Sequence, residues 1–103
     1  MAKFVLTYTG GTAPQTPEEG EAVMAAWMSW FGELGASVTD GGNPFADAKT
    51  VNPDGSVTAG GSSSLGGYSI IDAADLDAAV GLAKGCPNLS AGGSVDVYTT
   101  MDM

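Results

Sequence analysis

Two kinds of hydrophobic pattern divide the chain into its predicted elements. Alternation of apolar and polar positions predicts strands at residues 3–9, 36–40, 68–71 and 94–101. Recurrence of apolar residues every three to four positions predicts helices at residues 17–34 and 75–84. The predicted order is therefore strand, helix, strand, strand, helix, strand, which forms two strand-helix-strand halves.

The stretch 66–87 has the clearest boundaries. Its strand is an aromatic and β-branched run behind a glycine pair, and Asp75 then caps a helical pattern that ends at Lys84 and Gly85. The apolar stripe of this helix consists of Leu76, Ala79, Val80 and Ala83. Because the alanines are small, we expect this helix to pack closely on a sheet.

The first predicted helix has the widest apolar surface of the chain. Thr16 is a good capping residue, and Pro17 suits the first helical turn. The apolar stripe comprises Val23, Trp27, Trp30 and Leu34, and it is extended sideways by Met24, Met28 and Phe31. Since truncation of a buried tryptophan to alanine costs about 3–5 kcal/mol, we expect this helix to anchor the core and to end at Gly35.

An additional hairpin is predicted between the second and third strands. Residues 48–51 and 56–59 flank a turn in which Pro53 presets the backbone and Gly55 accepts a positive φ. The two strands are short and polar, so we expect them at an edge. The glycine- and serine-rich residues 60–67 predict a flexible loop, which is either a lid or slack.

Right-handed crossovers would join these elements into an antiparallel sheet with both helices on one face. We therefore predict an α+β fold, a ferredoxin-like βαββαβ sandwich with an extra hairpin, in a single domain that spans residues 1–103. Val5, Thr7, Ser69 and Ile71 are expected on the uncovered face. Because a monomer would expose this partly apolar face, we expect two copies to pair through it as a homodimer.

The charge of the chain excludes several partners. Three lysines, no arginine and twelve carboxylates give a net charge of −9, so no cationic surface can neutralise phosphates. Nucleic acid and anionic membrane surfaces are thereby excluded, and no apolar run approaches the roughly 18 residues that span a bilayer. The first residues lack the apolar core of a secretory signal, and Cys86 has no second cysteine, so we expect a soluble cytoplasmic protein.

Several local strings, together with the order of elements, resemble the YCII-related family of small dimeric α/β-barrel proteins. The matching positions cover nearly the whole chain and are Tyr8, Trp27, Trp30, residues 33–35, 38–42, 50–51, 54–55 and 65–68, Ile71, Leu76, Ala79 and Pro87. The resemblance implies the same fold and the pairing of two chains into a dimeric α/β barrel. It assigns no activity.

The chain departs from the family in two polar features. Some relatives carry a histidine on the first helix, paired with an aspartate, and that pair has been proposed as catalytic. This chain contains no histidine, so the pair cannot operate here. Other relatives carry an Asp-Gly-Pro-Phe string followed by acidic and lysine residues ahead of the Gly-Gly-Tyr, a place that residues 60–64 take here.

Five residues are candidates for a ligand pocket, and each also has a simpler structural interpretation. Asp40 follows the second strand, where it either serves as a site acid or begins a turn. Tyr8, Trp27 and Tyr68 could line an apolar pocket with a polar rim, although core packing is the commoner role of a tryptophan. Lys49 either holds an anionic group or guards a strand edge. No catalytic residue is assigned.

No metal and no cofactor are predicted. The chain has no histidine and one cysteine, and its carboxylates lack the spacing of a calcium loop. The aspartates at 72, 75 and 77 are explained by helix capping, and no glycine group has the residues of a phosphate loop. Cys86 follows a helix C-terminus, which does not favour a thiolate, so we interpret it as structural.

Three functions stay open at this point. The one that we favour is a dimeric binding module whose pocket between helix and sheet holds a small molecule. The second is a cofactor-independent enzyme on the same scaffold, in which Asp40 or Tyr68 acts as acid or base. The third is a structural protein whose sheet face docks another chain.

Overall fold

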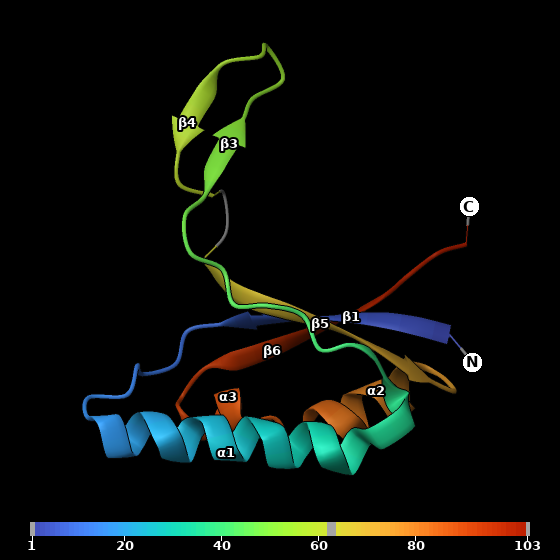
Figure 1. Ribbon diagram of the computed structural model, residues 1–103. Helices are drawn as coiled ribbons and strands as arrows, with labels where there is room; N and C mark the ends of the chain where they lie inside the picture. The colour runs from blue at the N-terminus through green and yellow to red at the C-terminus, as the bar shows by residue number, and fades with distance from the viewer. Residues whose placement is uncertain (1, 62–63, 103) are drawn as a thin grey trace.

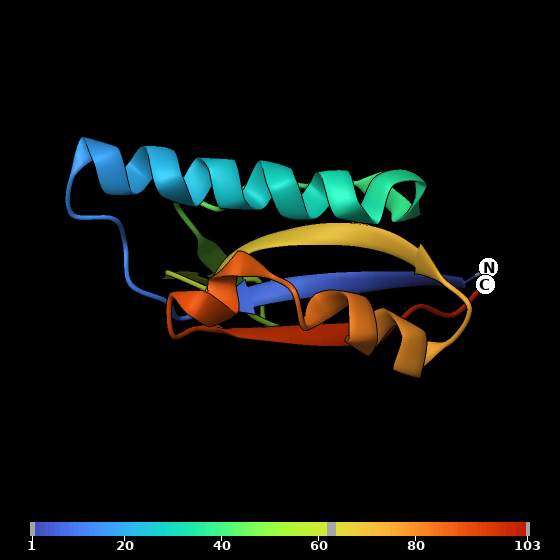
Figure 2. The same ribbon diagram turned by 90° about the horizontal axis from the view of Figure 1, so that it is seen from below.

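The computed structural model describes residues 2–61 and 64–102. The elements of its main body are, in chain order, β1 (Ala2–Thr9), α1 (Pro17–Leu34), β2 (Val38–Asp40), β5 (Leu65–Ala73), α2 (Leu76–Ala83), α3 (Pro87–Ser90) and β6 (Ser94–Thr99). The four strands form one antiparallel sheet in the order β2-β5-β1-β6. Figures 1 and 2 show α1, α2 and α3 on the same face of this sheet. This is the ferredoxin-like arrangement, so the predicted α+β fold is confirmed.

The central strand β1 supplies the middle of the core. Its residues Phe4, Leu6 and Tyr8 point toward the helices because side chains alternate along a strand. Across the ladder with β5, Phe4 lies opposite Ile71 and Leu6 lies opposite Ser69. Phe4, Leu6 and Ile71 are at most 1% exposed, so the core lies between β1, β5 and the helices.

Helix α1 begins and ends as predicted. The Thr16 hydroxyl accepts a hydrogen bond from the Glu19 backbone N–H at 3.1 Å, and Gly35 caps the C-terminal end. The apolar stripe is narrower than predicted, because Met24 and Met28 point to solvent and are 63% and 69% exposed. Although α1 is 18 residues long, neither it nor another helix of the described residues is long and apolar enough to cross a membrane.

The two faces of β5 are the reverse of the prediction. Ser69 and Ile71 are buried under the helices, whereas Tyr68 and Ile70 lie opposite Thr7 and Val5 on the other face. Ile70 and Ile71 are both apolar, so the local sequence does not say which of them faces the core. The pairing of β5 with β1 decides it, since a shift of one residue would exchange the faces.

Several predicted boundaries are also wrong. A 3-10 helix at Gly35–Ser37 replaces the first part of the strand predicted at 36–40. The strand predicted at 68–71 is β5, which begins earlier, at Leu65, so the loop predicted at 60–67 is shorter than expected. Residues 62 and 63 of that loop lie outside the described residues. The last strand ends at Thr99 rather than at 101, and α3 occupies a stretch predicted as a loop.

The predicted hairpin is confirmed, but it forms a sheet of its own. Its strands, β3 (Lys49–Val51) and β4 (Val57–Ala59), pair with each other and not with the main sheet. Figure 1 shows the hairpin standing on the side of the main sheet that the helices leave uncovered. Val51 and Val57 lie opposite each other and are 71% and 60% exposed. The hairpin therefore carries exposed apolar surface.

The turn that follows β2 requires glycine at one of two adjacent positions. The Asp40 carboxylate accepts a hydrogen bond from the Gly42 backbone N–H at 2.9 Å, and Gly42 has a φ of +76°. A Cβ at Gly42 would overlap the Tyr68 carbonyl oxygen. At Gly41 a Cβ would meet no atom within 4 Å, and its φ is not positive.

We expect Gly42→Ala to lower the free energy of unfolding by more than about 2 kcal/mol, because both the backbone strain and the overlap must be relieved. The matched variant Gly41→Ala is expected to change it by less than about 1 kcal/mol. Urea denaturation measures both differences. Equal effects of the two substitutions would contradict the described path of this turn.

Candidate functional site

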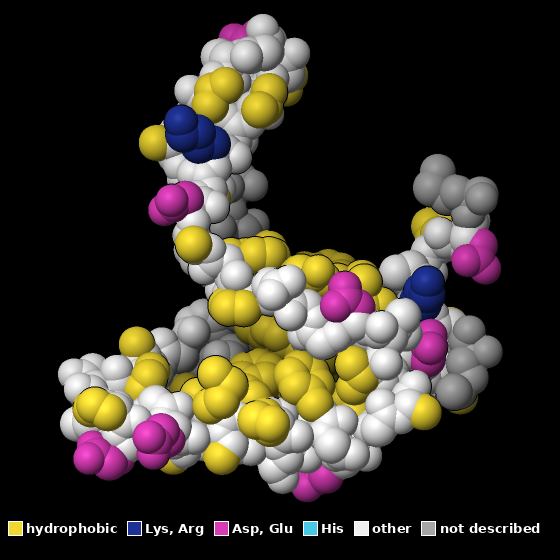
Figure 3. Space-filling view, viewed as in Figure 1, with side chains coloured by type: hydrophobic (Ala, Val, Ile, Leu, Met, Phe, Trp, Pro, Cys, Tyr) yellow, Lys and Arg dark blue, Asp and Glu magenta, His cyan; other side chains and the backbone are white. Residues whose placement is uncertain are grey.

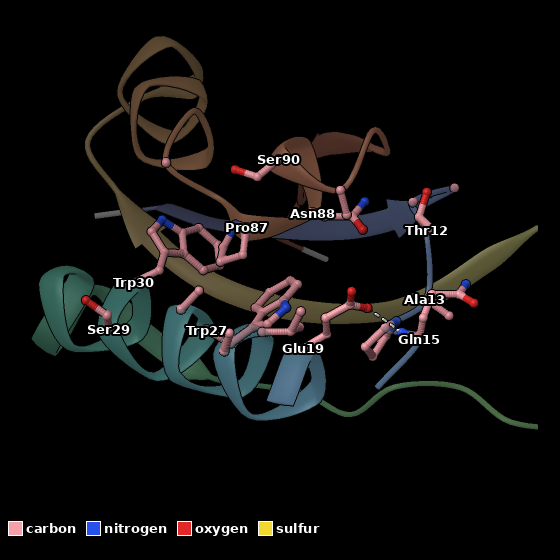
Figure 4. Close-up of a pocket in the computed structure, with 18 of the residues that line it drawn as sticks. Thr12, Ala13, Gln15, Glu19, Trp27, Ser29, Trp30, Pro87, Asn88 and Ser90 are labelled. Atoms are coloured by element: carbon pink, nitrogen blue, oxygen red, sulfur yellow. Dashed lines mark hydrogen bonds between the residues drawn. The ribbon is translucent and has the colours of Figure 1, made fainter. Parts of the chain in front are cut away.

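A groove with a volume of about 920 Å³ runs between α1 on one side and the segment that contains α3 on the other. Figure 4 shows its side chains, which come from α1, from the loop between β1 and α1, and from α3. On α1 the lining residues include Glu19, Val23, Trp27, Trp30 and Glu33. Their spacing of three and four residues places them on one face of the helix. At 1.5 Å per residue, the groove follows α1 for about 21 Å.

Two tryptophans are the largest apolar side chains that line the groove. Their ring centroids are 5.7 Å apart with the planes at 76°, an edge-to-face arrangement. Trp30 is 3% exposed, and its indole N–H donates to the Leu82 carbonyl oxygen at 3.2 Å, so its ring is fixed. Trp27 is half-buried, and its indole N–H has no hydrogen-bond partner among the described residues. Trp27 therefore offers the groove both an aromatic surface and a free donor.

Tyr8 supports Trp27 from the sheet. The two rings have centroids 5.0 Å apart at 76°, so the edge of one meets the face of the other. The Tyr8 hydroxyl donates to the Ser69 hydroxyl at 2.7 Å, and Ser69 donates to the Gly41 carbonyl oxygen at 2.7 Å. Burial raises the pKa of Tyr8 to about 12, so near neutral pH it stays a protonated donor. Tyr8 is thus a rigid support and not a base.

Asn88 fixes the opposite wall of the groove. Its side-chain amide donates to the Thr9 carbonyl oxygen at 3.1 Å and to the Ser94 carbonyl oxygen at 2.8 Å. These bonds tie α3 to the end of β1 and to the start of β6. Sequence reasoning did not find Asn88, because its partner Thr9 lies 79 positions away. The position of Ser69 under Tyr8 was missed because Ser69 was assigned to the other face of the sheet.

The charged groups of the groove are acidic. Glu19 lies near one end, where its carboxylate accepts a hydrogen bond from the Gln15 backbone N–H at 2.6 Å, and Glu33 lies near the other end (Figure 4 shows the Glu19 end). Among the lining residues that the structure describes, there is no lysine. The groove is consequently apolar in the middle and negative toward its ends.

A second polar cluster lies on the uncovered face of the sheet. The Tyr68 hydroxyl donates to the Asp40 carboxylate at 3.2 Å, and Phe45 stacks on the Tyr68 ring at a centroid distance of 5.8 Å. Asp40 also caps its own turn through Gly42 and is exposed. This arrangement agrees with the turn-forming interpretation of Asp40.

The five sequence candidates therefore do not meet at one place. Tyr8 and Trp27 contact each other on the helix side of the sheet, and Asp40 and Tyr68 contact each other on the opposite side. Lys49 is exposed on β3 in the hairpin. Only Trp27 among the five lines the groove.

No reactive thiol or metal cluster is evident in the described residues. Cys86 is 2% exposed, and burial raises the pKa of its thiol to about 11, so it is not a nucleophile near neutral pH. Within residues 2–61 and 64–102, no three side chains of His, Cys, Asp or Glu are grouped to hold a metal ion.

The fold and the groove define a class of protein, a small α+β sandwich with one open sheet face and an aromatic groove on its helix side. The profile of the YCII-related domain matches residues 3–103 of the chain. The chain therefore belongs to the YCII-related family, and the resemblance of its local strings is confirmed.

One solved structure with a similar fold is 5-chloro-2-hydroxyhydroquinone dehydrochlorinase (TftG) from Burkholderia phenoliruptrix AC1100, in complex with 2,5-dihydroxybenzoquinone. The superposition has a TM-score of 0.59 and covers 98% of this chain and 95% of that chain, at 19% sequence identity. At this identity the likeness shows the fold alone. No curated protein matched the chain.

The raised pKa of Tyr8 predicts a loss of stability in alkali. The folded protein favours the neutral phenol of Tyr8, which therefore contributes to the free energy of unfolding. This contribution is fully present below about pH 10, and it is lost as the pH rises toward about 12. A shift of this size corresponds to about 2–3 kcal/mol in the free energy of unfolding. Cys86 contributes in the same direction between about pH 9 and 11.

We expect Tyr8→Phe to flatten the decline above about pH 11, measured by urea unfolding at a series of pH values. The control is Met28→Leu, an exposed residue without a titratable group on the solvent side of α1, which should keep the decline of the unmodified protein. If Tyr8→Phe declines as steeply as the unmodified protein, burial of Tyr8 does not govern alkaline stability.

Proposed function

We propose that this YCII-related protein binds a small molecule in the groove between α1 and α3. The observation that carries the proposal is Trp27, which lines the groove with a half-buried ring, stands against Tyr8, and has an indole N–H without a hydrogen-bond partner among the described residues. A mostly apolar cleft with a few fixed polar groups is the usual form of a small-molecule site.

The size of the groove supports the same function. Its volume of about 920 Å³ lies at the upper end of the range of ligand pockets, about 300–1,000 Å³. Its walls are fixed by the hydrogen bonds of Trp30 and Asn88, so little ordering would be needed on binding. The dehydrochlorinase of similar fold was solved in complex with 2,5-dihydroxybenzoquinone, so this fold can bind a small molecule.

Binding is favoured over catalysis by the chemistry near the groove. Tyr8 and Cys86 have pKa values of about 12 and 11, so neither acts as a base near neutral pH. Glu19 and Glu33 are separated by about 21 Å along α1, too far to act on one bond. An enzyme that uses Asp40 or Tyr68 would need a second site on the opposite face of the sheet. Catalysis by Asp40 or Tyr68 at such a second site is the alternative function.

Trp27→Leu tests the site directly. With the neutral dye Nile red as probe, we expect the dissociation constant to rise at least about tenfold, because the aromatic surface and the indole donor are both lost. Dye fluorescence measures binding, and circular dichroism checks that the fold is retained. The control is Met28→Leu on the solvent side of the same helix. Unchanged dye binding by Trp27→Leu would remove the groove as the site.

We also propose that two copies of the chain pair through the uncovered sheet face. This open face consists of Val5, Thr7, Tyr68, Ile70, Asp96 and Tyr98. Figure 3 shows hydrophobic side chains in the hollow between the hairpin and the C-terminal segment. A second copy would cover this face, as the family resemblance implies. It would also cover the exposed valines of the hairpin. An isolated pair of strands is marginally stable in water, so the hairpin would gain stability from this contact.

Ile70→Asp tests this pairing, because a charge in the centre of an apolar interface is costly. We expect light scattering to give the mass of two chains for the unmodified protein and of one chain for the variant. Met24→Asp, which places the same charge on exposed α1, should remain dimeric. A single-chain mass for the unmodified protein at all concentrations would exclude the homodimer and favour the docking of a different protein.

We further propose that the chain works as one domain in the cytoplasm. The family profile spans residues 3–103, and β1, α1, β2, β5, α2 and β6 contribute to one core. Cys86 is a free, buried thiol, which suits a reducing compartment.

A further inference from the structure

We infer that the groove prefers aromatic ligands that carry a positive charge over neutral ones, and neutral ones over anions. This inference rests on the proposed binding function and adds the chemical class of the ligand.

The charged side chains that line the groove are the carboxylates Glu19 and Glu33. The chain has three lysines and no arginine. Lys3 lies in β1 and Lys49 in the hairpin, while Lys84 lines a separate shallow cleft with Val80 and Leu89. No cation is therefore available among the described lining residues to pair with an anionic ligand.

The aromatic residues favour the same sign of charge. The face of an aromatic ring carries negative charge density and attracts cations, and tryptophan does so more strongly than tyrosine or phenylalanine. Trp27 lies between the two carboxylates along α1, and Glu33 follows Trp30 by one helical turn. A ligand ring packed against Trp27 would thus place its charged substituent near an aromatic face or near the Glu33 carboxylate.

The N-terminus of α1 opens onto the same groove but does not supply an anion site. The Thr16 hydroxyl accepts the hydrogen bond of the Glu19 N–H, so that donor is satisfied. Glu18 and Glu19 lie in the first turn and offset the positive end of the helix dipole. The net charge of −9 further disfavours the approach of anions.

Three compounds that share a phenethyl group test the preference. Phenethylammonium is a cation, 2-phenylethanol is neutral and 3-phenylpropionate is an anion. Each is titrated into ¹⁵N-labelled protein, and the indole N–H signals of Trp27 and Trp30 are followed by NMR. We expect phenethylammonium to bind at least about fivefold more tightly than 3-phenylpropionate, with the alcohol between them. The Trp27 signal should move more than that of Trp30, whose N–H is already bonded to Leu82.

The variant Glu33→Gln tests whether the charge preference arises within the groove. We expect it to reduce the affinity ratio of cation to anion by about twofold or more, as is typical of a partly exposed ion pair. Glu21→Gln removes the same charge from α1 at an exposed residue that does not line the groove. This control should keep the ratio of the unmodified protein.

The possible results separate the two proposals. Equal binding of the three compounds, or tighter binding of the anion, would refute the charge preference and leave the groove as a binding site. If none of them moves the Trp27 signal, the binding function itself fails. If the two glutamine variants lower the ratio equally, net charge and not the groove sets the preference, and the inference is refuted.

Discussion

The pairing of β1 with β5 determines what each face of the sheet does. It places Phe4 opposite Ile71 and Leu6 opposite Ser69 under the helices, and it leaves Ile70 on the other side. A shift of one residue would turn Tyr68 and Ile70 toward the helices and Ser69 and Ile71 away from them. A second ladder pairs β1 with β6 and places Tyr98 opposite Val5 and Asp96 opposite Thr7. The support beneath the groove follows from the first ladder, and the composition of the open face follows from both.

A short chain of buried hydrogen bonds connects that ladder to the groove. Tyr8 donates to Ser69, and Ser69 donates to Gly41 in the turn after β2, so sheet and turn are joined inside the core. A buried hydroxyl costs free energy unless it is paired, and this pairing needs each of the three groups in place. The ring of Tyr8 then meets Trp27 at 5.0 Å. The position of Trp27 in the groove is therefore set from the interior of the protein.

Much of the fold could be predicted from local patterns, and most of the site could not. Thr16, Gly35 and Asp75 mark helix ends because caps act over a few residues, and the hairpin turn is equally local. The prediction of which face of β5 is buried was wrong, because the adjacent residues Ile70 and Ile71 are equally apolar. The wall made by Asn88 depends on a contact across 79 positions, which periodicity does not encode. Trp27 was found because its helical spacing and its large ring are both visible in the sequence.

The two proposed surfaces lie on opposite sides of the sheet, and this separation has a functional consequence. The groove is lined by residues of α1 and α3, and Figure 1 shows these helices and the hairpin on opposite sides of the sheet. A second copy that covers the open face would leave the groove accessible to small molecules. The proposed assembly and the proposed binding would therefore use different residues, Ile70 for the first and Trp27 and Glu33 for the second. The core beneath them, centred on β1, is the element that both surfaces share.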